Sequence, residues 1–391
     1  MGEAVAMGEV VPMASAEVVI AGAGPVGMLL GCLLAGHGVE VAICERRAGP
    51  DERTRAIGVH PPGLAALDAA GVGARFRTGA IALERGEVLA RGRTLACVAF
   101  GAARRVLILP QRRTDAILRE RLEALGVSVR TGCEVIGVRQ DESGVTVRER
   151  SGGRERETDA AFLVAADGVR SAVRGALDIP WVRRGGAARH SMVDVPDADD
   201  DPVARLYCEP GGLVESFPLP DGRRRWVVRH PKGVDTLPAE RFAAEISART
   251  GIRITMPAPA TAEPMTSEPT TFAASQHRAE RLVDGRVILL GDAAHEISPI
   301  GGQGMNLGWV DALALTGTLI RALAVGRGDF DVYARRAARA AADAQRRSRF
   351  YMSMGAPADA GSQRARELLI RTLGAPPLRD AAASLVTMSG I

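Results

Sequence analysis

The first fifty residues alternate between apolar runs and glycines in a way that predicts a strand, a tight turn and a helix. Residues 17–21 are a short apolar run rich in β-branched side chains, and a glycine-rich turn at 22–27 separates them from an apolar helical stretch over 28–34. Gly38 ends this helix, and residues 39–44 predict a second buried strand. The pattern therefore predicts one βαβ unit.

The rest of the chain continues an α/β pattern and adds a β-rich region. The pattern predicts β structure over 82–107, an amphipathic helix over 111–125, short strands with Pro and Gly turns over 182–278, and a long apolar helix over 304–324. We expect a Rossmann-type domain made of residues 15–80, 108–181 and 279–328, an inserted β-rich domain made of 81–107 and 182–278, and C-terminal helices over 329–391.

Composition narrows the class of protein. Hydrophobic residues make up 46% and charged residues 25% of the chain, and the mean hydropathy is +0.03, as in a globular enzyme. The net charge of +4 is small and its basic residues lie among acidic ones, so we expect no nucleic-acid or membrane partner. The five cysteines form no C-x-x-C pair, which predicts no metal site and no disulfide framework. With no targeting segment evident, we expect a cytoplasmic protein.

The turn at 22–27 has the spacing of a dinucleotide-binding motif. Its sequence is Gly22-Ala23-Gly24-Pro25-Val26-Gly27, placed between a strand and a helix. The first glycine permits the tight turn, the second lets a pyrophosphate approach the backbone, and the third lets the helix pack on the strand. Glu45, at the end of the next strand, has the place of an acid that binds a ribose. The alternative is a glycine-rich turn without a ligand, and the motif alone does not separate NAD from FAD.

A second motif distinguishes FAD from NAD as the ligand. The segment from Gly285 to His295 predicts a strand ending in Gly291-Asp292, and a glycine-rich loop over 299–306 leads into the long helix. At this point the chain resembles the single-component FAD-dependent aromatic hydroxylases, the family that contains para-hydroxybenzoate hydroxylase. Within it, the tail from residue 366 resembles the linker that precedes a thioredoxin-like domain in the aromatic polyketide hydroxylases, a domain that we expect to be missing here.

The resemblance implies roles for individual residues. Asp292 would contact the flavin ribityl chain, and the loop would lie beside the isoalloxazine ring, with the N–H groups of Gly304 and Met305 toward its pyrimidine edge. The Asp167-Gly168 turn would serve FAD and NAD(P)H. The cofactor-binding residues expected in total are Gly22, Gly24, Pro25, Val26, Gly27, Glu45, Arg46, Arg55, Gln111, Asp167, Asp292, Pro299, Gly302, Gly304, Met305 and Asn306.

The resemblance also implies an activity. NAD(P)H would reduce FAD, O2 would form a C4a-hydroperoxyflavin, and its terminal oxygen would pass to an aromatic ring. Baeyer–Villiger oxidation, epoxidation, reduction and a non-catalytic role as an FAD-binding pathway partner remain open on the same scaffold. No residue is identified as a catalytic base, and a monomer or homodimer is expected.

The β-rich region offers candidates for the substrate pocket. They are Tyr207, Phe217 and Trp226, together with Pro299 of the loop. Apolar and aromatic side chains there predict a broad pocket that suits a multi-ring aromatic polyketide better than a small benzoate. The alternative is that these side chains fill the core of a sheet and that the pocket is small.

Overall fold

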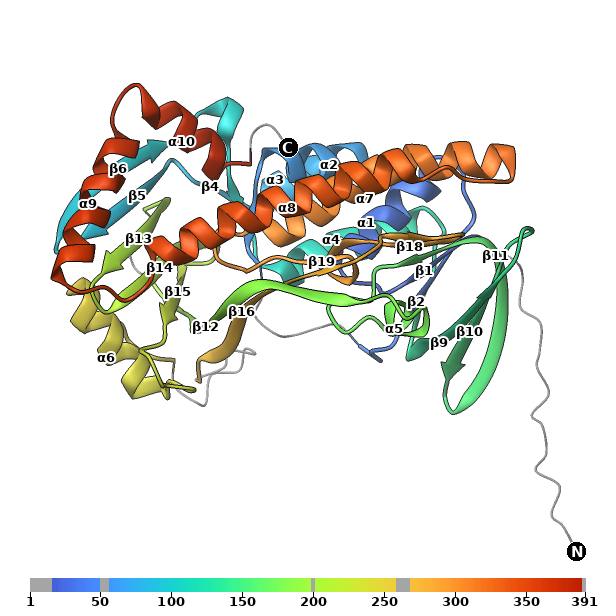
Figure 1. Cartoon of the computed structure of the whole chain (residues 1–391), viewed down its shortest axis with the longest axis horizontal. Coiled ribbons are helices and arrows are strands. Elements are labelled where there is room, and N and C mark those ends of the chain that lie inside the picture. The colour runs from blue at the N-terminus through green and yellow to red at the C-terminus, as the bar shows by residue number, and fades with distance from the viewer. Residues whose placement is uncertain (1–15, 50–55, 198–200, 258–267, 389–391) are drawn as a thin grey trace, which may run out of the picture.

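The computed structural model describes residues 16–49, 56–197, 201–257 and 268–388. These residues form two eight-stranded sheets, one small three-stranded sheet and the helices around them. The two large sheets lie at opposite ends of an elongated molecule, and two long helices extend along it (Figure 1). The cofactor motifs belong to the sheet at one end, and the β-rich region forms the sheet at the other.

The first sheet contains the predicted βαβ unit. Strands β1 and β2 are parallel neighbours, and β11 pairs in parallel with β1 on the other side. The antiparallel strands β9 and β10 extend this sheet from β11. Its core strands are buried on both faces, which explains their continuous apolar sequences. The strands are β1 (Ala16–Ala21), β2 (Val41–Glu45), β8 (Val129–Thr131), β9 (Cys133–Gln140), β10 (Val145–Ser151), β11 (Arg154–Ala165), β17 (Val283–Asp284) and β18 (Val287–Leu289).

The second sheet has the order β19-β16-β12-β15-β14-β13-β5-β6 and is antiparallel except for the pair β13 and β5. Its strands are β5 (Arg85–Ala90), β6 (Arg93–Ala99), β12 (Trp181–Pro196), β13 (Val203–Glu209), β14 (Gly212–Leu219), β15 (Arg223–Arg229), β16 (Thr270–Ala279) and β19 (His295–Glu296). The small sheet joins β3 (Gly58–Val59), β7 (Leu107–Ile108) and β4 (Ile81–Ala82). Because β12 and β16 are long, they extend from the second sheet toward the first (Figure 1).

Helices cover both sheets. Helix α1 packs against α4 and α7, whereas α8 crosses from the first sheet to the second, where α9 and α10 follow (Figure 1). The helices are α1 (Pro25–Ala35), α2 (Pro61–Ala69), α3 (Gly73–Gly79), α4 (Gln111–Ala124), α5 (Ala172–Ala176), α6 (Ala239–Thr250), α7 (Gln303–Val325), α8 (Asp331–Met354), α9 (Ala360–Gly374) and α10 (Leu378–Val386), with 3-10 turns η1 (Ala102–Arg104) and η2 (Gly291–Ala293).

The β-rich region differs from its sequence-based description in two respects. It contains one helix, α6, whose Phe242 and Ile246 are fully buried against the second sheet. Their spacing of four residues is the periodicity of an amphipathic helix, so the signal was present in the sequence. In addition, β12 is a single strand of 16 residues rather than a series of short strands. Irregular pairing between Arg183 and Ala188 interrupts its register with β16 and explains why its pattern is hard to read.

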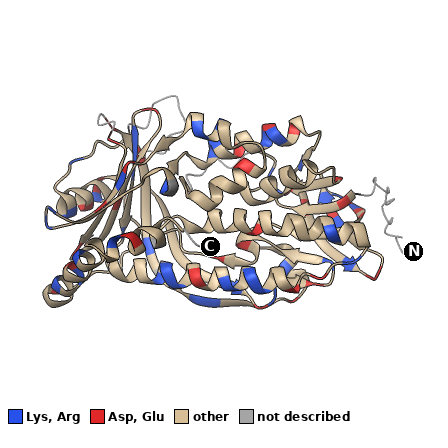
Figure 2. Cartoon of the chain, turned by 90° about the horizontal axis from the view of Figure 1, so that it is seen from above, with Lys and Arg blue, Asp and Glu red and all other residues tan. Residues whose placement is uncertain are grey.

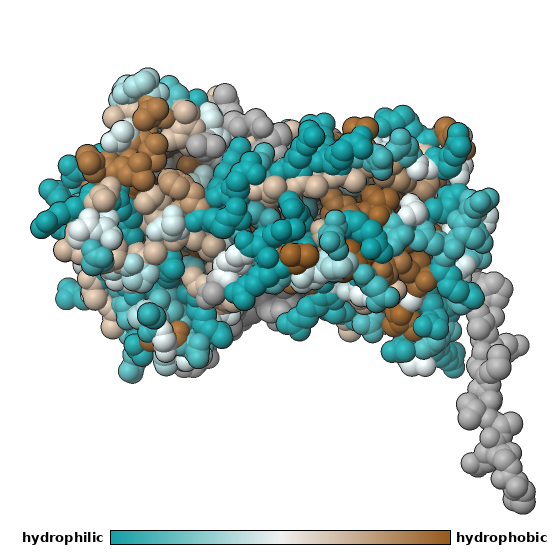
Figure 3. Space-filling view, viewed as in Figure 1, coloured by the Kyte–Doolittle hydropathy of each residue, from teal (hydrophilic) through white to brown (hydrophobic). Residues whose placement is uncertain are grey.

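The surface carries mixed charge. Lys and Arg residues lie among Asp and Glu residues along the helices and strands (Figure 2). An apolar area covers part of α9 and α10 (Figure 3), where Leu368, Leu369, Leu378 and Val386 are exposed. Among the described residues, α7 alone has the length and hydropathy of a membrane-crossing helix. Many of its apolar residues, including Trp309 and Leu315, are buried in the protein core.

Candidate FAD site

The glycine-rich turn is packed tightly at its first and third glycines and open at its second. Gly22 has φ +104°, and a Cβ there would lie 2.4 Å from the Ala166 carbonyl oxygen. A Cβ on Gly27 would lie 2.1 Å from the Gly22 carbonyl oxygen. At Gly24, in contrast, a Cβ would meet no atom within 4 Å. This geometry fits a phosphate group at the N-terminus of α1, where free N–H groups and the helix dipole attract an anion.

Residues at the start of α1 connect the turn to the Gly-Asp motif. Pro25 occupies the first turn of α1, and its carbonyl oxygen accepts a hydrogen bond from Trp309 Nε1 at 3.0 Å. Val26 packs against Gly291 and Gly308, where an added Cβ would lie 3.2 and 2.6 Å from its side chain. Two motifs that are far apart in the sequence therefore meet at this helix terminus. The Val26 side chain packs against both Gly291 and Gly308.

Glu45 is held at the edge of the same turn. Its carboxylate is buried and accepts hydrogen bonds from Ala23 N at 2.9 Å, Arg47 N at 2.9 Å and Arg47 Nε at 2.8 Å. Burial opposes ionisation, but these hydrogen bonds lower the pKa of Glu45 below its usual range. An ionised acceptor beside the turn fits the expected ribose contact. The neighbouring Arg46 is exposed.

The Asp167 turn lies beside the Gly-Asp motif. Asp167 Oδ2 accepts hydrogen bonds from Ala172 N at 2.8 Å and Val173 N at 3.3 Å, at the start of α5. Asp167 Oδ1 is buried and has no hydrogen-bond partner among the described residues, and burial raises the pKa of this carboxyl. Arg174 of α5 donates to the Ala293 carbonyl oxygen at 2.9 Å. The turn is therefore joined to Ala293, the residue after Asp292. The Asp292 side chain itself is exposed.

The loop at 299–306 leaves polar groups without partners. Pro299 is exposed, and Gly302 precedes α7 with φ +64°. No side chain in the described part of the protein caps α7, so the N–H groups of its first turn, which includes Gly304 and Met305, have no side-chain acceptor there. Gln303 is fully buried, yet neither atom of its side-chain amide has a partner among the described residues. Unsatisfied buried polar groups of this kind fit a site that a polar ring system completes.

Asn306 has a structural role in this loop. Its side chain is fully buried: Oδ1 accepts from His60 N at 2.9 Å, and Nδ2 donates to the carbonyl oxygens of Gly58 at 3.0 Å and Gly302 at 2.9 Å. These hydrogen bonds join α7 to β3, and the expected cofactor contact of Asn306 stays a prediction. His60 was missed by the sequence reasoning. It is buried beside Gly302, and its Nδ1 has no partner among the described residues.

Of the two remaining expected residues, the structure describes Gln111 and not Arg55. Gln111 is the first residue of α4. Its backbone N–H donates to the Ala56 carbonyl oxygen at 3.1 Å, and its side chain donates to Asp115 at 3.5 Å. Arg55 lies outside the described residues. Gln111 therefore adjoins Ala56, the first described residue after that gap.

The substrate candidates separate onto two faces of the second sheet. Tyr207 and Trp226 are 5% and 3% exposed, and their rings stack at 6.3 Å. They pack with Phe242 of α6, on the face that is turned away from the loop at 299–306. These two expectations need correction, because the side chains fill the core beneath α6. Phe217 is half-buried on the other face, beside Ile57 and the small sheet.

Comparison with known proteins assigns the family. Residues 15–348 match the family model described as FAD binding domain. The chain belongs to this family. The match confirms FAD as the cofactor expected from the motifs, and its range includes all the described strands of both large sheets.

Two of the similar curated proteins come from Streptomyces species. The chain is 33% identical over 317 residues to 12-dehydrotetracycline 5-monooxygenase/anhydrotetracycline 6-monooxygenase of Streptomyces rimosus subsp. rimosus, covering 76% of this chain and 61% of that protein. It is 32% identical to rifampicin monooxygenase of Streptomyces venezuelae, covering 76% and 63%. The chain thus spans about three-fifths of the length of these relatives.

A solved structure supports the fold assignment. The structure of OxyS anhydrotetracycline hydroxylase from Streptomyces rimosus superimposes with a TM-score of 0.79 and 29% identity, over 97% of this chain and 77% of that one. The predicted α/β class, with a Rossmann-type FAD-binding domain and a β-rich insertion, is confirmed by this likeness. The predicted resemblance to the aromatic polyketide hydroxylases is confirmed as well.

Proposed function

We propose that this protein is an FAD-dependent monooxygenase that hydroxylates a polycyclic aromatic polyketide. One combined observation supports the proposal. The chain matches the FAD-binding family, and its sequence is similar to monooxygenases named for tetracycline intermediates and rifampicin. Within this proposal NAD(P)H is the reductant and O2 the oxidant, and the working form is a cytoplasmic monomer or homodimer.

The residues around the turn would bind and orient the cofactor. The N-terminus of α1 at Gly24 would hold the pyrophosphate, Glu45 the adenosine ribose and Asp292 the ribityl chain. The first turn of α7 would direct N–H groups at the flavin ring. Bound FAD would supply the redox and oxygen chemistry, and the protein would supply position and exclusion of water.

The proposal is tested by reductant and oxygen consumption. The FAD-loaded protein is mixed with NADPH or NADH under air, with and without a polycyclic phenol, and the products are analysed after reaction under 18O2. We expect the phenol to accelerate oxidation of the reductant and to gain one 18O atom. A protein that binds FAD but oxidises no reductant would be a non-catalytic FAD-binding partner. Reductant oxidation that is independent of O2 would identify a reductase.

A further inference from the structure

A buried carboxyl group lies in the middle of the second sheet. Glu215 is the fourth residue of β14, is 4% exposed, and lies in register between Leu206 of β13 and Val227 of β15. Its side chain makes no hydrogen bond or ion pair with any residue that the structure describes. Burial alone raises the pKa of Glu215 to about 7. A buried carboxyl without a partner is unfavourable for folding, which suggests that it serves a ligand.

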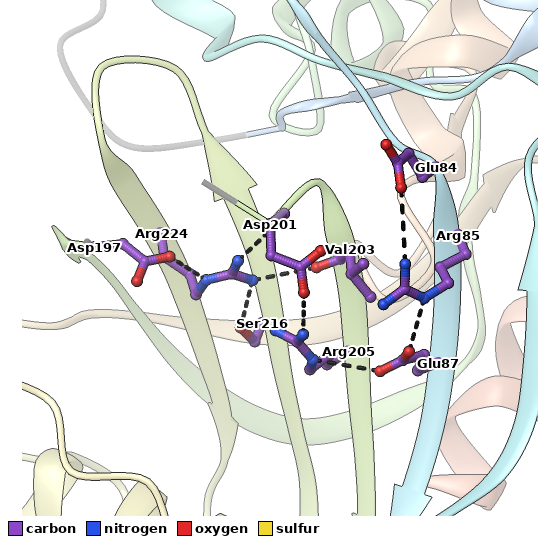
Figure 4. A network of polar contacts seen from close by, with 9 residues as sticks. All are labelled: Glu84, Arg85, Glu87, Asp197, Asp201, Val203, Arg205, Ser216 and Arg224. Carbon is purple, nitrogen blue, oxygen red and sulfur yellow. Dashed lines mark hydrogen bonds and ion pairs between the residues drawn. The ribbon is translucent and has the colours of Figure 1, made fainter. Parts of the chain in front are cut away.

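On the opposite face of the same sheet, the charged side chains form ion pairs. Beside Glu215, Ser216 faces that side and accepts a hydrogen bond from Arg224 Nη1 at 3.1 Å (Figure 4). Arg224 also pairs with Asp197 at 2.5 Å, and Arg205 pairs with Glu87 at 3.4 Å. Each of these charges has a partner of opposite sign. Glu215 has no such partner among the described residues, although it belongs to the same sheet.

The neighbours of Glu215 on its face of the sheet pack against residues beside the candidate FAD site. On its face of β14, Leu213 packs on one side with Ile300 and Tyr351, and Leu219 packs on the other side with Ile57. Ile300 belongs to the loop at 299–306, and Ile57 adjoins β3, which Asn306 joins to that loop. Glu215 therefore lies between two apolar clusters that both include residues beside the candidate FAD site.

A second polar group without a partner occurs near this position. The Tyr351 hydroxyl of α8 is buried and has no hydrogen-bond partner among the described residues. Its ring lies against the same loop, because a Cβ on Gly301 would be 3.0 Å from Tyr351 Cδ2. The region between loop and sheet thus presents an acceptor and a hydroxyl group beside the apolar side chains of these two clusters. Such a surface suits a flat, mostly apolar molecule that carries hydroxyl groups.

We propose that Glu215 accepts a hydrogen bond from a ring hydroxyl of the substrate and thereby selects hydroxylated polycyclic aromatics over their ethers. This inference rests on the proposed function. It names one residue that would determine the substrate specificity of the proposed monooxygenase. A site that places a buried acceptor opposite a substrate hydroxyl discriminates against an analogue without it, because the acceptor is then left desolvated and unpaired.

The test measures ligand binding through the absorbance of the bound flavin. FAD-loaded protein is titrated with 2-naphthol and, separately, with 2-methoxynaphthalene, which differs by one methyl group. We expect 2-naphthol to bind on the order of ten-fold more tightly. In Glu215→Leu this preference disappears through weaker binding of 2-naphthol, and in Glu215→Gln it is reduced, because an amide oxygen still accepts. Glu87→Gln, on the opposite face of the sheet, keeps the wild-type preference.

The outcomes separate this inference from the proposed function. FAD content and substrate-stimulated NADPH oxidation are measured on the same preparations. Loss of FAD binding or of O2-dependent oxidation in the wild type would overturn the proposed function. If the wild type retains both but binds the phenol no better than the ether, or binds neither, the role of Glu215 is wrong. Equal preferences in wild type and Glu215→Leu lead to the same conclusion.

Discussion

The glycine-rich turn allows cofactor binding to be separated from folding by two matched substitutions. Gly24 has φ −74° and ψ 174°, which alanine adopts without strain, and its added Cβ would meet no atom of the described residues within 4 Å. Gly24→Ala should therefore change the free energy of unfolding of the apoprotein by less than about 1 kcal/mol. The methyl group would, however, occupy the space in which a phosphate approaches the backbone. We expect FAD to bind on the order of ten-fold more weakly or worse, about 1.4 kcal/mol.

Gly27→Ala is the opposite case. Its Cβ would lie 2.1 Å from the Gly22 carbonyl oxygen and 3.3 Å from Ala166 Cβ, so α1 must move away from the turn. Displacing backbone against backbone in a packed core costs about 1–3 kcal/mol. The loss should appear in the apoprotein, before any cofactor is added.

Urea unfolding of the apoproteins and titration of FAD fluorescence distinguish the two effects. The expected pattern is a stable Gly24→Ala that binds FAD poorly and a destabilised Gly27→Ala. Wild-type FAD affinity in Gly24→Ala would refute the placement of the pyrophosphate at this helix terminus. Equal destabilisation by both substitutions would refute the packing argument.

Three further predictions concern other parts of the site. Asn306→Ala should lower the free energy of unfolding by about 3 kcal/mol, measured with urea, because three buried backbone groups lose their partner. Asp292→Ala should weaken FAD binding by about 1–3 kcal/mol and more than Asp167→Ala does, since Asp167 also caps α5; equal affinities in fluorescence titrations would contradict this. Trp226→Phe should reduce stability by about 1–2 kcal/mol and leave 2-naphthol binding unchanged, because Trp226 packs beneath α6.

The glycine motif and its strand were predictable because the information is local. Gly22, Gly24 and Gly27 lie within one turn between β1 and α1, and their roles depend on backbone geometry that only this spacing allows. Glu45 follows at the end of the neighbouring strand, one βαβ unit later. The structural role of Asn306 was not predictable locally, because its hydrogen bonds to His60 and Gly58 span 246 and 248 residues of sequence.

The substrate face was not predictable in the same way. Alternation along a strand shows that Tyr207 and Leu206 point to opposite faces, but it does not show which face meets the cofactor domain. That choice depends on α6, which covers the face of Tyr207 and Trp226 through Phe242. Without a helix predicted in this region, the large side chains of Tyr207 and Trp226 fit the lining of a pocket. With α6 in place, they belong to the core.

The same reasoning explains why Glu215 is inconspicuous in the sequence. A glutamate between Val214 and Ser216 is ordinarily read as the solvent-facing member of an alternating strand. Here both faces of β14 are covered, one by α6 and the other by α8 and the small sheet, so almost every residue of the strand is buried. In a strand covered on both sides, a charged residue has no solvent to face. Among the described residues Glu215 has no hydrogen-bond or ion-pair partner, and this is the observation behind its proposed contact with a substrate hydroxyl.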